Sequence, residues 1–146
     1  MFKSKKSIIE SLPTGWKILN PPGAPSNLDV GKLRLRPVLK SRELSIDIEE
    51  MRLRARKVSS NLGVEAGDLI INKQHELSDA FQDYYIPLPA VDLFGPRGGR
   101  DILCLGFYQG LWMPCFGKLN GTWRKGVRFA CIKQYHLSQP TNQGGV

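Results

Sequence analysis

The segment from Arg100 to Leu137 constrains the fold more than any other part of the chain, because it gathers residues that need burial. It contains all three cysteines, two of the three tryptophans and three of the six phenylalanines. Cysteine and large apolar side chains are among the most often buried in proteins. We therefore expect the rest of the chain to support or extend a core built around this segment.

Three β-leaning runs, divided by turn signals, make up this segment, and they span residues 101–108, 111–116 and 123–137. Gln109-Gly110 separates the first two runs, and Asn120-Gly121 precedes the third. Asn-Gly is a strong hairpin signal, because both central residues of a type I′ turn need positive φ. Pro114 cannot donate to a sheet ladder, so the second run is expected to be an edge strand or to be bulged. The runs predict an antiparallel meander of about three strands.

The clearest helix is predicted over about residues 45–62. Its apolar residues recur at steps of three and four and form one stripe; they are Leu44, Ile48, Met51, Ala55, Val58 and Leu62. Asp47 is placed to begin this helix, and Gly63 to end it as the C′ residue. The pattern also allows a second helix over about 73–85, after a short buried strand at 69–71.

These elements predict a single α+β domain, with a mostly antiparallel sheet and one main amphipathic helix. The chain has 146 residues, of which 41% are hydrophobic, which is enough for one modest core. Residues 1–27 are expected to form a basic, partly ordered arm that ends in a proline-rich linker. The globular domain is expected over 28–137, and a disordered tail over 138–146.

The formal net charge of +8 favours a partner with negative charge, such as nucleic acid, an anionic membrane or an acidic protein. The charge is uneven, because residues 1–40 and 97–146 each sum to +6 while residues 64–96 sum to −5. An acidic middle between two basic ends would also suit self-association into a homo-oligomer. A solvated acidic face explains the same pattern.

The favoured hypothesis is a non-enzymatic protein that binds a polyanion, most of all RNA or a ribonucleoprotein. Interleaved aromatic rings and cations are what single-stranded nucleic acid requires, since bases stack on rings and phosphates bind cations. The alternative is that the rings fill the core and the cations face water. The candidate nucleic-acid-binding residues are Lys32, Arg34, Arg36, Arg54, Arg97, Arg100, Trp123, Arg124, Lys125 and Arg128.

A second hypothesis is a peripheral membrane protein that self-assembles, with the general layout of small viral matrix-type proteins, a viral structural or accessory role. In that case a basic, partly apolar arm would lie on an anionic membrane surface; its candidate residues are Lys3, Lys5, Lys6, Trp16 and Lys17. A third hypothesis is a protein–protein interaction or inhibitor module. We expect an intracellular location, cytoplasmic or nuclear, or the inner face of a membrane under the second hypothesis.

The sequence gives only weak signals for a catalytic site or a metal site. A metal site would have to combine Cys104, Cys115, Cys131 and His136, whose spacing includes no CxxC or HxxxH pair. The Gly95–Arg100 loop offers glycines and two arginines to an anion, but it lacks the lysine-containing ending of a P-loop. No cofactor is expected.

Overall fold

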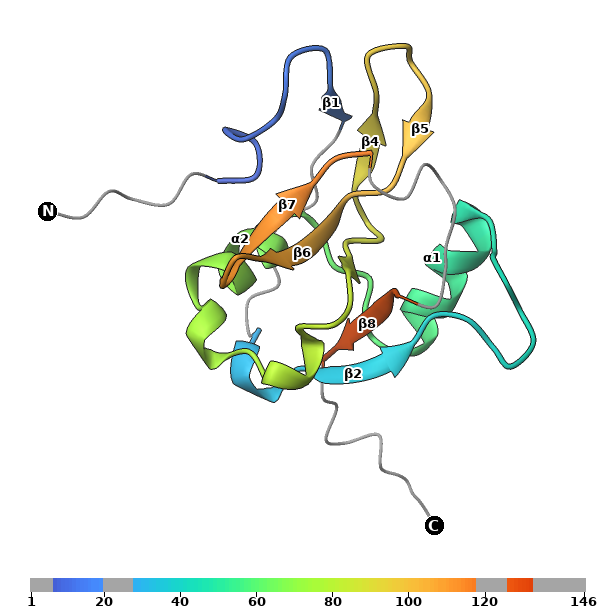
Figure 1. The fold of residues 1–146 in the computed structure, drawn as a ribbon. Helices are drawn as coiled ribbons and strands as arrows, with labels where there is room; N and C mark the ends of the chain where they lie inside the picture. Colours follow the sequence, from blue (N-terminus) through green and yellow to red (C-terminus); the bar gives the residue numbers. More distant parts are fainter. Residues whose placement is uncertain (1–6, 20–27, 118–125, 133–146) are drawn as a thin grey trace, which may run out of the picture.

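Two α-helices and three small antiparallel sheets are formed by the residues that the structure, a computed structural model, describes: 7–19, 28–117 and 126–132 (Figure 1). The predicted single-domain α+β fold is confirmed. The helices are α1 (Ile48–Lys57) and α2 (Val64–Asn72). Three short 3-10 turns accompany them, η1 (Val30–Lys32), η2 (Gln74–Glu76) and η3 (Asp79–Phe81).

Each sheet is small, and no strand is longer than five residues among those described. The first sheet has the order β1 (Lys17–Leu19), β4 (Asp92–Phe94), β5 (Arg100–Asp101). The second has the order β3 (Ile86–Pro87), β6 (Cys104–Tyr108), β7 (Leu111–Cys115). The third pairs β2 (Arg34–Pro37) with β8 (Arg128–Cys131).

The predicted hairpin between residues 101 and 116 is present as β6 and β7. Its turn residues Gln109 and Gly110 have φ of 50° and 83°, as a two-residue turn with positive φ at both positions requires. Pro114 lies in β7, which is the edge strand of its sheet, as expected. The third predicted strand does not extend this meander, because β8 pairs with β2. Asn120-Gly121 lies outside the described residues.

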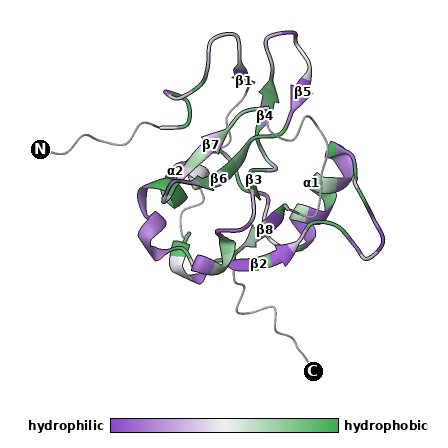
Figure 2. Cartoon of the chain, in the orientation of Figure 1, coloured by the Kyte–Doolittle hydropathy of each residue, from purple (hydrophilic) through white to green (hydrophobic). Residues whose placement is uncertain are grey.

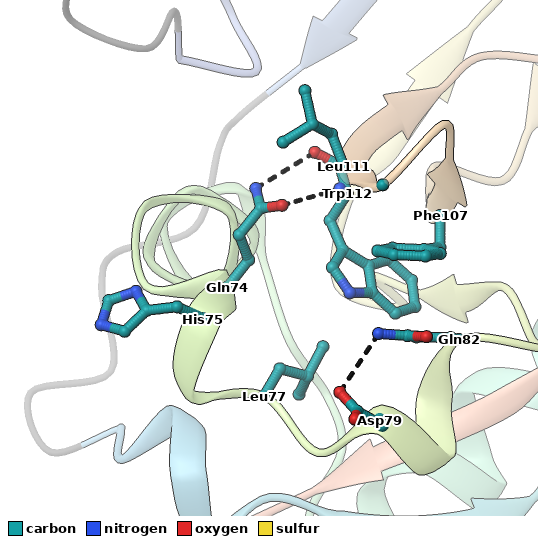
Figure 3. A pocket seen from close by; sticks show the side chains of 9 residues that line it. Gln74, His75, Leu77, Asp79, Gln82, Phe107, Leu111 and Trp112 are labelled. Atoms are coloured by element: carbon teal, nitrogen blue, oxygen red, sulfur yellow. Dashed lines mark hydrogen bonds between the residues drawn. The ribbon is translucent and has the colours of Figure 1, made fainter.

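The outer edge of β7 is closed by one side chain from η2. The Gln74 side chain accepts a hydrogen bond from the Trp112 amide at 2.9 Å and donates to the Trp112 carbonyl at 3.4 Å (Figure 3). A side-chain amide thus occupies the place that a neighbouring strand would take. Since Pro114 has no amide hydrogen, the two residues together protect this edge against further pairing.

The helix predicted over 45–62 is shorter than expected. It begins as predicted at Asp47, whose carboxylate accepts a hydrogen bond from the Glu50 amide at 2.8 Å. It ends at Lys57 because Ser59 has a left-handed φ of 56°, which a right-handed α-helix cannot include. The Ser60 amide bonds the Ala55 carbonyl and the Ser59 amide bonds the Arg56 carbonyl, which is the Schellman pattern.

Contacts with β8 explain why this helix stops before Gly63. The buried Ser60 hydroxyl donates to the Ala130 carbonyl at 2.7 Å, and the Ile132 amide donates to the Ser59 carbonyl at 2.9 Å. Gly63 is instead the N-cap of α2. The strand predicted at 69–71 is therefore wrong, because those residues are helical, and the helix allowed over 73–85 is replaced by the turns η2 and η3.

The core consists of two groups of buried side chains. The larger group includes residues of α2, β3, β6 and β7, and the smaller joins Met51 and Ala55 of α1 to Val127 and Phe129 around β8. Figure 2 shows β4 and β6 as hydrophobic and β2 as largely hydrophilic. The boundary expected at residue 27 is redrawn, because Ile8 is 0% exposed within the larger group and β1 pairs with β4.

Candidate nucleic-acid interface

Two of the predicted cations, Arg34 and Arg36, lie together on β2 and are exposed. They alternate with Leu35, which packs against the core, so both arginines lie on one side of the strand. In the register of the third sheet, Arg34 lies opposite Cys131 and Arg36 opposite Phe129. Residues opposite each other in an antiparallel pair share a face, so the arginines border the face of β8 that packs near α1.

A pocket of about 480 Å³ lies between the end of β2, the residues that follow it, and one flank of α1. On this flank, Arg54 follows Glu50 by four residues, and Lys57 and Val58 follow Arg54 by three and four, so they share a helix side. The residues that line the pocket are Pro37, Val38, Leu39, Lys40, Ser41, Glu50, Arg54, Lys57, Val58 and Phe129. The exposed lysines Lys40 and Lys57 thus lie on the same pocket, next to the arginines of β2.

The acidic residues beside this pocket, Glu43 and Glu50, both pair with Arg54, whose single positive charge offsets one of their two negative charges. Its guanidinium donates to both carboxylate oxygens of Glu43 at 2.6 and 2.7 Å and to Glu50 at 2.8 Å. A fourth hydrogen bond, of 3.0 Å, reaches the Val38 carbonyl. The side chain of Arg54 is only 12% exposed, so we leave this predicted cation out of the interface. Hydrogen bonds from Arg54 and from the Lys40 amide lower the pKa of Glu43 from 4.5 to about 2.

The exposed cations Lys40 and Lys57 line the pocket, and the exposed Arg34 and Arg36 lie on β2, the strand that leads into it. None of the four makes an ion pair within 4.0 Å to an acidic residue in the described ranges. We refer to these four residues as the β2–α1 face. Lys40 and Lys57 were not among the nucleic-acid-binding residues predicted from the sequence. Lys57 nevertheless follows Glu50 and Arg54 at helical spacing, which places it on the same flank of α1.

The predicted cations of the Gly95–Arg100 loop do not extend this face. Arg100 forms ion pairs with Glu49 at 2.7 Å and Asp92 at 3.6 Å. Arg97 is exposed, but its loop lies at the opposite end of the molecule from β2 (Figure 1). The amides of Gly95 and Gly98 bond to carbonyls inside the loop, which leaves them unavailable to an anion.

The other predicted cations are dispersed or lie outside the described ranges. Lys32 is 3.9 Å from Asp29. The guanidinium of Arg128 lies over the Tyr84 ring, 4.4 Å from its centroid, and donates to the Val127 carbonyl. The predicted residues outside the described ranges are Lys3, Lys5, Lys6, Trp123, Arg124 and Lys125.

Aromatic rings of the described β6–β7 segment serve the fold rather than an open platform. Trp112 is 4% exposed and packs against Phe107 with ring centroids 5.4 Å apart. These rings line a pocket of about 340 Å³ that also includes His75 and Asp79 (Figure 3). Asp79 accepts a hydrogen bond from Gln82 at 3.2 Å, and its charge disfavours a phosphate there.

The arm proposed for membrane binding is partly built into the fold. The Trp16 ring lies over Gly95 and Gly117, where a Cβ on Gly117 would be 2.9 Å from it, and it packs against Phe116 with centroids 6.2 Å apart. Lys17, in β1, is exposed. Among the described residues, no helix has the length and apolarity needed to cross a membrane.

The cysteines lie in apolar surroundings. Cys104 and Cys115 are directly opposite on β6 and β7, whereas Cys131 belongs to β8. Burial raises the pKa of Cys104 well above its usual range and that of Cys131 to about 11, so both are thiols at neutral pH. Within the described part of the chain, no three His, Cys, Asp or Glu residues converge to hold a metal ion, and His136 lies outside it.

Comparison with protein-family models, with curated proteins and with solved structures finds no match to this chain.

Proposed function

We propose that the chain binds RNA through the β2–α1 face. The observation that carries this proposal is that the exposed Lys40 and Lys57 line one pocket and the exposed Arg34 and Arg36 lie on the strand leading into it, while Arg54 pairs with Glu43 and Glu50. A face with unpaired positive charge attracts phosphates at long range and binds them at contact. Arg34 and Arg36 supply planar donors for phosphate oxygens, and Lys40 and Lys57 supply point charges.

Salt dependence follows directly from this mode of binding. Each phosphate contact with single-stranded RNA releases counterions, and each contributes a slope of about −0.7 to log K against log salt. With a contact from each member of the face, the affinity should fall by about 50-fold between 50 and 200 mM salt. Affinity that does not change across this range would rule out phosphate binding as the mechanism.

The decisive variant is the double charge reversal Arg36→Glu and Lys57→Glu, assayed by fluorescence anisotropy with a labelled single-stranded RNA. Its matched control is Arg56→Glu with Arg97→Glu, which changes the net charge equally at exposed positions away from the face. We expect the first variant to lose at least tenfold in affinity and about 1.4 units of salt slope, since two contacts are removed. The control should lose much less. Equal losses in the two variants would show that net charge alone, rather than this face, attracts the RNA.

The membrane hypothesis receives less support, because Trp16 is partly buried and packs on Phe116, Gly95 and Gly117. Flotation with phosphatidylserine vesicles provides its test. Binding to vesicles that is lost in the Arg36→Glu and Lys57→Glu variant, without any binding to RNA, would replace the RNA proposal with a membrane one.

A further inference from the structure

We propose that the pocket on the β2–α1 face receives one unpaired base of the bound RNA. This inference rests on the proposed function and adds the class of ligand, namely single-stranded rather than double-stranded RNA. Three features of the pocket support this inference: the chemistry of its walls, its preformed shape and the cations at its rim.

The walls combine apolar and polar groups in the way that a base requires. Val38, Leu39 and Val58 provide aliphatic surface, and Phe129 closes the floor with 1% of its surface exposed. Ser41 and Glu50 provide a hydroxyl and a carboxylate. A base has apolar faces and a polar edge, so it suits both kinds of wall, whereas an acyl chain could form no hydrogen bond with Ser41 or Glu50.

The pocket is preformed by hydrogen bonds that do not depend on a ligand. Arg54 joins the Val38 carbonyl to Glu43 and Glu50, which holds the segment after β2 against α1. The Lys40 amide donates to Glu43 at 2.6 Å, and this closes the turn that follows. On the other wall, Val58 is the C-cap residue of α1. A pocket that is already ordered loses little conformational entropy when a base enters it.

The cations at the rim of the pocket favour a base that belongs to an RNA strand over a free base. Lys40 and Lys57 line the pocket, and Arg36 precedes the lining residue Pro37. Phosphates on either side of an inserted base would therefore meet positive charge. The carboxylate of Glu50 is an acceptor suited to an exocyclic amino group, which cytosine carries and uracil lacks. In a duplex the bases are stacked and paired, so they are not free to enter.

The test fills the pocket without changing charge. Val58→Phe adds bulk at one wall, and Ser41→Ile adds bulk from an exposed position in case the first variant is unstable. The matched control is Leu53→Phe, on an exposed residue of α1 that does not line the pocket. Thermal unfolding checks that each variant is folded. The probes are a labelled octamer of cytidine, an abasic octamer with the same phosphates, and an RNA duplex.

We expect either filled variant to bind the cytidine octamer about tenfold more weakly than the wild type, which is the scale of one stacked base. Affinity for the abasic octamer and the duplex should change by less than about twofold, since phosphate contacts remain. The Leu53→Phe control should bind all three probes like the wild type.

Two results would overturn the inference. If the filled variants bind the cytidine octamer normally while Arg36→Glu with Lys57→Glu abolishes binding, RNA binds the face but no base enters the pocket. If filling the pocket weakens the abasic octamer equally, the pocket serves the phosphates rather than a base. Failure of the proposed function is recognised separately, because the charge reversal would then leave every RNA probe unaffected.

Discussion

At the scale of single residues, the charge on Glu43 is expected to make stability depend on pH. Its pKa is lowered from 4.5 to about 2 in the folded protein by hydrogen bonds from Arg54 and the Lys40 amide. A carboxyl group whose folded pKa is depressed stabilises the fold above its unfolded pKa, and this contribution disappears as the pH falls through the folded value. The loss should therefore occur between about pH 4.5 and pH 2.

The variant Glu43→Gln isolates this effect, because glutamine has a similar shape and no charge. We expect the variant to be less stable than the wild type at pH 7, and the difference in unfolding free energy to shrink as the pH falls from 4.5 towards 2. Urea titrations at several pH values measure this difference in unfolding free energy. A difference that is the same at pH 7 and pH 2 would show that the carboxylate charge of Glu43 does not stabilise the fold.

A second lesson at this scale concerns the predicted site. Arg54 and Arg100 were expected to meet RNA, yet each is held by carboxylates of the chain itself. Glu43 is 11 residues from Arg54, and Glu49 is 51 residues from Arg100. A pairing across such distances depends on how the chain folds back, so local spacing reveals only the i,i+4 pair of Arg54 with Glu50 and not these two.

At the scale of elements, the edge of β7 depends on Gln74. Gln74→Ala leaves the amide and carbonyl of Trp112 without their side-chain partner, at an edge where Pro114 offers no amide hydrogen. We expect a loss of stability of about 1 kcal/mol. We also expect stronger self-association than in the wild type, since open strand edges pair with each other.

Urea denaturation and sedimentation over a range of protein concentrations measure the two effects. The matched control is Gln82→Ala, which removes an exposed glutamine from the same pocket whose side chain bonds Asp79 rather than the backbone of β7 (Figure 3). If Gln74→Ala and Gln82→Ala sediment alike at every concentration, Gln74 does not guard this edge.

At the scale of the whole molecule, residues 7–19 belong to the fold rather than to a detached arm. Ile8 is buried in the larger core group, and the δ-carbon of its side chain would lie 2.7 Å from a Cβ placed on Gly67 of α2. Its amide also donates to the Asp68 carboxylate at 2.7 Å. Residues 7–19 thus contact α2 through Ile8 and pair with β4 through β1.

Ile8→Ala tests this attachment. Removing a fully buried isoleucine side chain should lower the free energy of unfolding by about 2–5 kcal/mol. Ile9→Ala is the control, because Ile9 is 45% exposed and its truncation should have little effect. Equal stability of the two variants in urea titrations would mean that residues 7–19 do not contribute to the core.

The sequence by itself determined the features that depend on neighbouring residues. The hairpin at Gln109-Gly110, the edge position of Pro114 and the start of α1 at Asp47 follow from backbone geometry and local hydrogen bonds. Alternation along β2 likewise places Arg34 and Arg36 on one side of the strand and Leu35 on the other.

Only the tertiary structure decided what depends on distant contacts. The end of α1 is set by hydrogen bonds to β8, which override the helical spacing that continues to Leu62. The pairing of β8 with β2 brings Phe129 to the pocket, and the fold brings Glu43 to Arg54 beside it. The physical reason is that burial and ion pairing are properties of residues brought together in space, and spacing along the chain does not specify which residues meet.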